Sequence, residues 1–382
     1  MFMDMSSELI HSLLPVFMTT VLGASMLTVG LVEGIAEATA AITKVFSGAL
    51  SDYLGKRKFL MVLGYALAAF TKPIFPLATS IGWVFGARFV DRIGKGIRGA
   101  PRDALVADIA PPRLRGAAYG LRQALDSIGA FLGPLLAVAF MVWFANDIKA
   151  VMWIAVVPAF IAVALLMIYV RDPQPHHAES TRTAPLTLAD ARRLPPGYWL
   201  VALLGAVFTL ARFSEAFLVL RALDVGIALA YVPVVMIAMN VAYAAFAYPA
   251  GIAADRISAR TLLLLGLMLL IAANVVLALA ASPLMALVGS VLWGLHMACT
   301  QGLLAKLVAD TAPARLRGTA FGIFNLVSGI ALLLASVIAG ALWSVFGAPA
   351  TFLAGAAFAA ATAFGLLAYP TKPQAANQET GS

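Results

Sequence analysis

A row of basic residues interrupts one of the apolar stretches of the sequence. Its members recur every three or four positions: Arg88, Arg92, Lys95, Arg98 and Arg102. At about 3.6 residues per turn they project within about a third of a helix circumference, along about 21 Å of its axis. One basic charge at the centre of a lipid-facing helix costs about 2.5–3.5 kcal/mol on insertion scales. This basic stripe must therefore face water, a protein partner or an anionic ligand instead of lipid.

Carboxylates occur in two pairs with helical spacing. Asp4 and Glu8 lie one turn apart, as do Glu33 and Glu37. Two neighbouring carboxylates in a low dielectric cannot both ionise cheaply, so one of them is expected to hold an exchangeable proton. The alternative is neutralisation by the basic stripe, which would give a fixed network of salt bridges. Both interpretations remain open for the first pair. For Glu33, Glu37 and Lys44 we favour the structural one, because unpaired charge in lipid is rare.

Further charges inside apolar segments are spaced as local ion pairs. Arg122 and Asp126 are four residues apart, and Arg212 and Glu215 are three apart. The two residues of each pair are expected to lie on one helix face and to neutralise each other's charge. Arg212 is also expected at the membrane depth of the first carboxylate pair. Lys72 is predicted to be a structural or snorkelling residue near the outer face.

A polar group on a late apolar segment raises the question of metal binding: His296, Cys299, Thr300 and Gln301. His296 could titrate near neutral pH, or bind a soft metal together with Cys299. Two ligands at this spacing are a weak metal signal, so we favour hydrogen bonding and predict no metal site. The pair His176–His177 is predicted to lie in a solvated loop. No Walker-type phosphate loop is present, so we predict no cofactor and expect a proton gradient as the energy source.

The composition is that of an integral membrane protein. The chain has 382 residues, of which 62% are hydrophobic and 12% charged, and its mean hydropathy is +0.94. Soluble domains are about half apolar and about a quarter charged. The apolar segments are continuous runs of about 20 residues rather than alternating runs of about ten, which predicts helices instead of a membrane barrel. The net charge of +8 implies no nucleic-acid partner, because basic residues concentrate in alternate loops. The single cysteine excludes an internal disulfide, and no signal peptide is apparent.

Twelve transmembrane spans are predicted, at roughly 1–22, 26–50, 59–79, 82–106, 116–142, 149–170, 197–219, 228–252, 261–281, 284–308, 318–345 and 348–369. The polar, proline-rich segment 171–196 is predicted to be a cytoplasmic linker. It separates an N-terminal six-helix bundle at 1–170 from a C-terminal six-helix bundle at 197–370. The polar tail at 371–382 is predicted to be disordered.

Basic residues in the loops predict the orientation in the membrane. One side carries Lys56, Arg57, Lys58, Arg113, Arg115, Arg171, Arg182, Arg192, Arg193, Arg256, Arg260, Arg315, Arg317 and Lys372. The other side carries Lys149 and Arg221. The positive-inside rule assigns the basic side to the cytoplasm, and an even number of spans places both termini there. We predict a monomeric, multi-pass protein of a bacterial-type inner (plasma) membrane, with the lipid bilayer as its surroundings.

An internal repeat relates the two halves. The segment Val106–Gly120 recurs as Val308–Gly322, and Gly48–Lys58 recurs more loosely as Gly251–Thr261, at offsets of 202 and 203 residues. Matches at one offset predict two six-helix bundles in parallel repeat, related by a pseudo-twofold axis. The seventh span begins near Gly197, so by the repeat the first span is short at its N-terminus. A late start codon and a short first helix are the two explanations we consider.

These motifs resemble the major facilitator superfamily across essentially the whole chain. The segment from Gly48 to Lys58 is similar to that family's motif between helices two and three, and Arg88 matches the basic residue of its helix-four motif. The run from Gly120 to Pro134 is similar to its helix-five motif associated with antiporters. The resemblance implies a rocker-switch transporter with its site between the bundles, lined mainly by helices one, four, seven and ten.

Residues at helix ends on the basic side, most of them charged, are expected to form a conformational latch: Gly48, Asp52, Gly55, Arg57, Asp108, Asp255, Arg260 and Asp310. Arg57 with Asp108, and Arg260 with Asp310, are expected ion pairs. Contacts made in only one of two conformations bias the equilibrium between them. A second group is expected to let helices approach closely: Gly120, Gly129, Gly133 and Pro134.

Together these features predict an all-α membrane transporter that works by alternating access. It is not expected to be an enzyme, because no nucleophile–base pair stands at a working spacing. The pathway for solute and protons is expected to include Asp4, Glu8, Arg88, Arg92, Lys95, Arg98, Arg102, Arg212, Glu215, His296 and Gln301. We expect proton-coupled efflux, by antiport, of a small organic solute or drug, anionic or zwitterionic because arginine holds carboxylates and phosphates well. Proton-driven uptake of an organic anion or metal chelate is the alternative, and a non-transporting scaffold or receptor is the least favoured.

Overall fold

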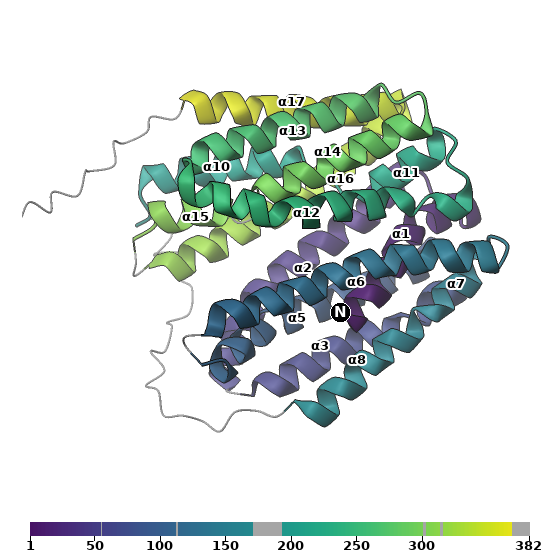
Figure 1. Cartoon of the computed structure of the whole chain (residues 1–382), viewed down its shortest axis with the longest axis horizontal. Coiled ribbons are helices and arrows are strands. Elements are labelled where there is room, and N and C mark those ends of the chain that lie inside the picture. The colour runs from purple at the N-terminus through teal and green to yellow at the C-terminus, as the bar shows by residue number, and fades with distance from the viewer. Residues whose placement is uncertain (55, 112–113, 171–192, 301–302, 314–315, 369–382) are drawn as a thin grey trace, which may run out of the picture.

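The computed structural model describes residues 1–54, 56–111, 114–170, 193–300, 303–313 and 316–368, which are almost entirely helical. They form two bundles, the N-terminal one in purple to blue and the C-terminal one in green to yellow (Figure 1). The N-terminal bundle contains α1 (Phe2–Val16), η1 (Phe17–Val21), α2 (Met26–Leu54), α3 (Arg57–Thr71), α4 (Ile74–Leu77), α5 (Ile81–Ile109), α6 (Arg115–Trp143), α7 (Ile148–Ile154) and α8 (Val156–Tyr169). The C-terminal bundle contains α10 (Pro196–Leu210), α11 (Ala216–Asp224), η3 (Leu229–Tyr231), α12 (Val234–Arg256), α13 (Ala259–Ala278), α14 (Pro283–Thr300), α15 (Leu303–Thr311), α16 (Arg317–Phe346) and α17 (Ala348–Ala368).

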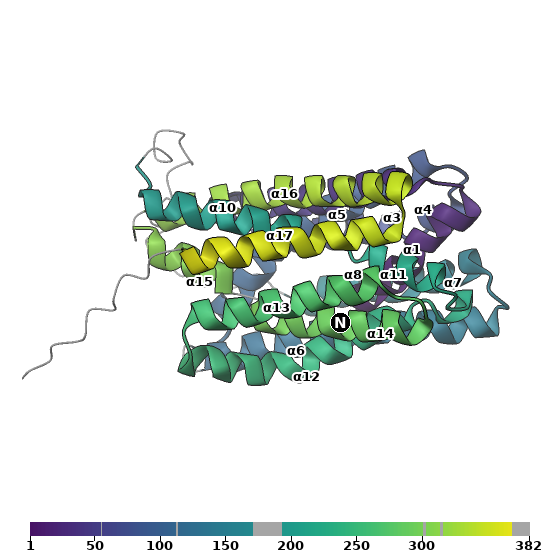
Figure 2. The same cartoon turned by 90° about the horizontal axis from the view of Figure 1, so that it is seen from above.

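These helices coincide with the predicted spans, taken singly or as consecutive pairs. Among the described residues, nine helices are long and apolar enough to cross a membrane, and Pro196–Leu210 is a shorter apolar helix. Figure 2 shows α10, α16 and α17 along one side of the C-terminal bundle and α12, α13 and α14 along the other. The prediction of an all-helical membrane protein is confirmed for this part of the chain. Most of the predicted linker, and the polar tail, lie outside the described residues.

The seventh span is interrupted, although the sequence predicts one continuous helix over 197–219. α10 ends at Leu210 and α11 begins at Ala216. Hydrogen bonds satisfy the backbone of the break: the Ser214 amide donates to Ser336 Oγ at 3.2 Å, and the Ala216 amide donates to Ser214 Oγ at 3.2 Å. Irregular backbone at membrane depth is tolerated where protein surrounds it or where it borders a cavity.

The two bundles contact each other chiefly through α2 and α16. Glycines let the two backbones approach: a Cβ at Gly34 would lie 2.9 Å from the Leu333 carbonyl oxygen, and a Cβ at Gly30 would clash with the Ser336 carbonyl. These glycines lie in the first half of α2, and their partners lie in the second half of α16. The bundles are therefore joined away from the end at which α8 finishes and α10 begins, which we call the linker end.

Toward the linker end, a cavity of about 270 Å³ separates parts of the two bundles. Gln123 of α6 lines it on one side, and Tyr243 and Cys299 line it from the C-terminal bundle. α6 and α12 remain in contact deeper in the molecule, where Asn240 Nδ2 donates to the Ala130 carbonyl at 3.2 Å. The bundles are thus packed together at one end and partly separated at the other.

Within the N-terminal bundle, two glycines bring α6 against α1. A Cβ at Gly133 would lie 2.7 Å from a carbonyl oxygen of α1, and one at Gly129 would lie 3.0 Å from Asp4 Cβ. Pro134 is buried beside them. Gly120 differs, because a Cβ there would meet no atom of a described residue within 4 Å. The expectation of close packing at Gly120 is wrong, since in this part of α6, near the linker end, no described helix lies against that position.

This difference gives a matched test of helix packing. Gly133→Leu should destabilise the protein by about 1–3 kcal/mol, because a larger side chain must displace α1. Gly120→Leu adds the same side chain where there is space, so its thermal midpoint should stay close to that of the unmodified chain. Thermal unfolding of both purified variants in detergent measures the difference, and equal losses would contradict the assigned packing.

Candidate functional site

The basic stripe lies on α5 and faces the interior of the N-terminal bundle. Arg88 and Arg92 are each 3% exposed, and both pair with carboxylates of α2. Arg88 Nη2 lies 2.7 Å from Glu33 Oε2, and Arg92 Nη2 lies 2.7 Å from Glu37 Oε1. Buried charges are tolerated when they are paired. The two carboxylates of α2 therefore neutralise the first half of the stripe.

The other members of the stripe have different surroundings. Arg102 pairs with Asp126 of α6 at 3.2 Å, and the Arg98 guanidinium lies over the Tyr65 ring, 4.7 Å from its centroid. Lys95 makes no ion pair or hydrogen bond with a described residue. Carboxylates thus neutralise Arg88, Arg92 and Arg102, and of the two members without an ion pair to a described residue, Arg98 is buried and Lys95 is exposed.

A histidine that the sequence analysis did not single out lies at the centre of this network. Arg92 Nη2 lies 2.6 Å from His11 Nε2. Because a guanidinium only donates, Nε2 must accept, so His11 is neutral here and carries its proton on Nδ1. Glu8 Oε2 lies 3.8 Å from Nδ1, and Glu33 Oε2 lies 3.6 Å from Nε2. His11 was missed from the sequence; its three-residue spacing from Glu8 on one helix is the signal by which it could have been found.

The same network contains atoms that could in principle bind a metal ion. Ligand atoms of His11, Glu33 and Glu37 lie within 4.8 Å of one another. However, Arg88 and Arg92 already hold the two carboxylates, so a cation would have to displace two positive groups. The arrangement suits a network of arginine, carboxylate and histidine better than a metal centre.

A cavity of about 280 Å³ adjoins this network between the two bundles. Both bundles contribute to its lining: Glu8, His11, Glu37, Lys95, Thr209, Arg212, Phe213, Ser214, Glu215, Trp293 and Leu332. The N-terminal bundle supplies ionisable side chains from α1, α2 and α5. The C-terminal bundle supplies the break between α10 and α11, together with α14 and α16. We call this space the central cavity.

Arg212 and Glu215 line the central cavity because the seventh span is interrupted between them. The ion pair expected between them is wrong: neither makes an ion pair with a described side chain. The prediction assumed a continuous helix, on which three-residue spacing places both side chains on one face. Arg212 instead lies over the Phe208 ring, 5.6 Å from its centroid, and its Nε has no hydrogen-bond partner among the described residues. The cavity therefore presents unpaired charges of both signs.

Other residues assigned to the pathway from the sequence lie away from the central cavity. Asp4 lies against Gly129 of α6. His296 is fully buried, and its Nδ1 lies 2.8 Å from the Gly266 carbonyl oxygen, which is a hydrogen bond rather than a metal contact. Gln301 lies outside the described residues.

The charged residues of α6 have partners on α5 in addition to the expected ones on α6. Arg122 Nη1 lies 2.7 Å from Asp103 of α5, whereas Asp126, one turn away on its own helix, is 3.8 Å distant. Asp126 lies closer to Arg102 of α5, at 3.2 Å. The expected pair of Arg122 with Asp126 is therefore present, and contact between α5 and α6 gives each of the two residues a closer partner of opposite charge.

The residues expected to form a latch are placed as follows. Arg57 Nη1 lies 2.6 Å from Asp108 Oδ2, which joins the start of α3 to the end of α5 within one bundle. Arg260 donates to a carbonyl of α17 at 2.6 Å, and Asp310 is exposed on α15. A Cβ at Gly48 would be in ordinary contact with α5 at 3.5 Å. The remaining latch residues lie outside the described structure, either wholly or in their side chains: Asp52, Gly55 and Asp255.

A second buried ion pair stabilises the N-terminal bundle. Lys72 is 1% exposed; its Nζ lies 2.9 Å from Asp91 Oδ1 and donates to Ser7 Oγ at 3.0 Å. The ammonium is enclosed between helices, so the snorkelling interpretation of Lys72 is wrong and the structural one holds.

Breaking this pair tests its structural role. Lys72→Met or Asp91→Leu alone should destabilise the chain by about 3–5 kcal/mol, since each leaves one buried charge unpaired. The double variant should recover most of this loss, because neither side chain then needs a charged partner. Thermal midpoints of the three variants give the result, with Lys306→Met, at an exposed position of α15, as the control. A double variant as unstable as the two losses combined would contradict the pairing.

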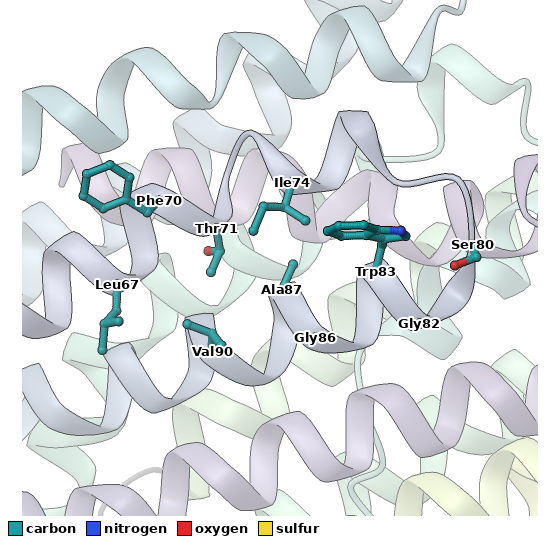
Figure 3. Close-up of a pocket in the computed structure, with 10 residues that line it drawn as sticks. All are labelled: Leu67, Phe70, Thr71, Ile74, Ser80, Gly82, Trp83, Gly86, Ala87 and Val90. Carbon is teal, nitrogen blue, oxygen red and sulfur yellow. The ribbon is translucent and has the colours of Figure 1, made fainter.

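A larger cavity, of about 560 Å³, lies between α3 and α5 (Figure 3). Thr71 and Ser80 are the polar residues of its lining, and the lining contains no charged residue. Phe70 and Trp83 on its border are 67% and 60% exposed. Such a surface suits lipid chains, whereas the smaller central cavity contains the ionisable groups. Volume alone therefore does not identify the functional site.

The structure thus has two helical bundles with a charged cavity between them, and both bundles line this cavity. This arrangement is that of a membrane transporter of the two-domain type. Comparison with known proteins agrees: the model of the Major Facilitator Superfamily matches residues 1–239 and 216–382. The chain belongs to the major facilitator superfamily, and it is therefore a transporter with the twelve-helix, two-domain fold and not an enzyme.

Three known proteins show how far the similarity extends. An uncharacterized MFS-type transporter of Methanocaldococcus jannaschii is 33% identical over 364 residues, which cover 93% of this chain and 89% of that protein. The multidrug resistance protein MdtH of an Enterobacter species is 30% identical over 115 residues, covering 30% of this chain and 28% of that protein. A variant of the nucleoside transporter NupG superimposes with a TM-score of 0.78 at 13% identity, covering 96% of this chain and 97% of that one, which is a likeness of fold.

Proposed function

We propose that this protein is a proton-coupled secondary active transporter that exports a small organic solute by alternating access through the central cavity. The observation that carries the proposal is the composition of that cavity. It lies between the bundles, and it is lined by ionisable groups of both. A solute bound there contacts both bundles, so its binding free energy can differ between the two orientations of the bundles. Such a difference is required for coupling.

The proton site in this proposal is His11 with its neighbouring carboxylates. His11 accepts from Arg92 and is therefore neutral in this conformation. A proton added to Nε2 would abolish that acceptor, repel Arg92 and attract Glu33, whose oxygen lies 3.6 Å away. Protonation of His11 would thus weaken the Arg92–His11 contact and change the position of Arg92 relative to Glu37. The groups that set this equilibrium come from three helices: Glu8 on α1, Glu33 and Glu37 on α2, and Arg88, Arg92 and Lys95 on α5.

The network also lies against the contact between the bundles. Ser214 Oγ, in the break of the seventh span, donates to Glu33 Oε2 at 3.5 Å. Glu33 therefore contacts Arg88, His11 and the opposite bundle through a single carboxylate oxygen. We propose that charge changes at His11 act on the packing of the bundles through this oxygen.

Export is favoured over uptake by two observations. The helix-five motif around Gly129 and Gly133 resembles that of antiporters, and part of the chain is similar to a multidrug resistance protein. The linker end is taken as cytoplasmic because its loops are rich in Lys and Arg. With this orientation, the cavity near Cys299 faces the cytoplasm in this conformation. We also propose that the protein acts as a monomer in the inner membrane.

Opposed pH gradients across reconstituted vesicles test coupling and direction. Vesicles are loaded with radiolabelled solutes from a panel of small organic acids, amines and amino acids. Acidifying the outside should accelerate release, because antiport exchanges an entering proton for a leaving solute. His11→Gln should remove this pH effect, while Lys306→Gln on exposed α15 should retain it. Slower release with acid outside would indicate uptake by symport instead, and no effect in either direction would contradict proton coupling.

The contact between α2 and α16 gives a separate test of alternating access. Gly30→Leu should push these helices apart away from the linker end, since its side chain would meet the Ser336 carbonyl. The bundles should then rock toward the opposite state and close the cavity lined by Cys299, the single cysteine of the chain. Maleimide labelling of Cys299 should slow severalfold. Gly86→Leu is the control, because a Cβ at Gly86 would meet no described residue within 4 Å. Unchanged labelling in Gly30→Leu would contradict the rocking motion.

A further inference from the structure

The central cavity contains unpaired charges of both signs. Lys95 of α5 and Arg212 in the break of the seventh span are the cations, and Glu215 is a carboxylate without an ion pair. Glu8 adds a second carboxylate; it lies 3.8 Å from His11, which is neutral in this state and therefore does not compensate its charge. A ligand that carries only one type of charge would satisfy one set of these groups and leave the other set unpaired.

In the cavity lining, the charges without an ion pair to a described residue balance. Glu37 is paired with Arg92, which leaves two carboxylates, Glu8 and Glu215, and two cations, Lys95 and Arg212. Each uncompensated charge in a low-dielectric interior carries a large desolvation cost. A solute that is neutral overall preserves this balance, whereas a net anion or net cation leaves one uncompensated charge in the cavity.

The C-terminal bundle adds an aromatic wall to the cavity. Phe213 and Trp293 both line it, with ring centroids 5.6 Å apart. Trp293 is 1% exposed, and its Nε1 has no hydrogen-bond partner in the part of the chain that the structure describes. Buried polar groups normally have partners, so an unpartnered donor on a cavity wall points to a ligand that accepts a hydrogen bond. The wall also offers aromatic surface to an apolar or planar group.

We propose that the solute is a small zwitterion with an aromatic or apolar body. This inference rests on the proposed transport function and specifies its substrate class. The anionic group binds Arg212 and Lys95, the ammonium group binds Glu215 and Glu8, and the body packs against Phe213 and Trp293. Each charged end of such a molecule exchanges its bound water for side chains of opposite charge. The net charge of the cavity is unchanged when the molecule binds.

Matched probes separate the two charges of the solute. L-Phenylalanine, L-tyrosine and L-tryptophan are each compared with the acid that lacks the amine and with the amine that lacks the carboxylate. The readout is the thermal midpoint of the full chain in detergent at neutral pH, titrated with each probe, because a ligand stabilises the state it binds. At least one zwitterion should bind about tenfold more tightly than either of its single-charge counterparts, as expected for the loss of one charged hydrogen bond.

Two charge-removing variants assign the ends of the solute. In Arg212→Gln, the zwitterion should bind no more tightly than the amine that lacks the carboxylate. In Glu215→Gln, the zwitterion should bind no more tightly than the acid that lacks the amine. Lys306→Gln, on the exposed face of α15, should keep both preferences. The thermal transition of each variant without probe shows whether it is folded, and Arg212→Lys should partly restore binding if charge is what acts.

The outcomes separate this inference from the proposed function. Single-charge probes that bind as tightly as their zwitterions, or no stabilisation by any of the probes, would overturn the zwitterion class. Transport itself would then still be decided by the vesicle experiment. A zwitterion that binds but moves no faster under a pH gradient would overturn proton-coupled transport and leave the binding assignment intact.

Discussion

The pairing of α5 with α2 is the interaction on which the structure depends. Arg88 and Arg92 are almost completely buried, and each lies 2.7 Å from a carboxylate of the neighbouring helix. Without Glu33 and Glu37 the two guanidiniums would be uncompensated inside the bundle, and neither lipid nor apolar packing could replace the lost partners. The same ion pairs orient His11, because Arg92 contacts both Glu37 and the imidazole. One network thus stabilises the bundle and positions the ionisable groups of the cavity.

The C-terminal bundle contributes differently, through irregular backbone rather than through buried ion pairs. The break between α10 and α11 is stabilised by Ser214 and Ser336, and it brings Arg212 and Glu215 to the cavity. The two halves of the fold are related by a repeat, yet their contributions to the cavity are not equivalent. The N-terminal half supplies a charge network that is largely neutralised, and the C-terminal half supplies unpaired charges and aromatic rings.

Much of the fold was predictable from the sequence, because hydropathy and loop charge are local properties. The runs of apolar residues locate the helices, since only helices satisfy backbone hydrogen bonds within one segment in lipid. The basic stripe was predictable too, because helical spacing and the cost of charge in lipid require it to face inward. The repeat predicted the two bundles. The ion pairs between neighbouring helices were less predictable: Arg122 lies nearer to Asp103 on α5 than to Asp126 on its own helix.

By itself, the sequence determined that this is a helical membrane transporter with charges directed into its interior, because hydropathy, spacing and the family motifs are written along the chain. Only the tertiary structure decided which of those charges remain unpaired. Arg88 and Arg92 are neutralised by α2, His11 is brought against Arg92, and the interrupted seventh span leaves Arg212 and Glu215 without the ion pair that a continuous helix predicts. These outcomes depend on distances between helices that are far apart in the chain. A charge-to-charge distance across a helix interface is set by packing and hydrogen bonding of the whole bundle, and no local pattern of residues specifies it.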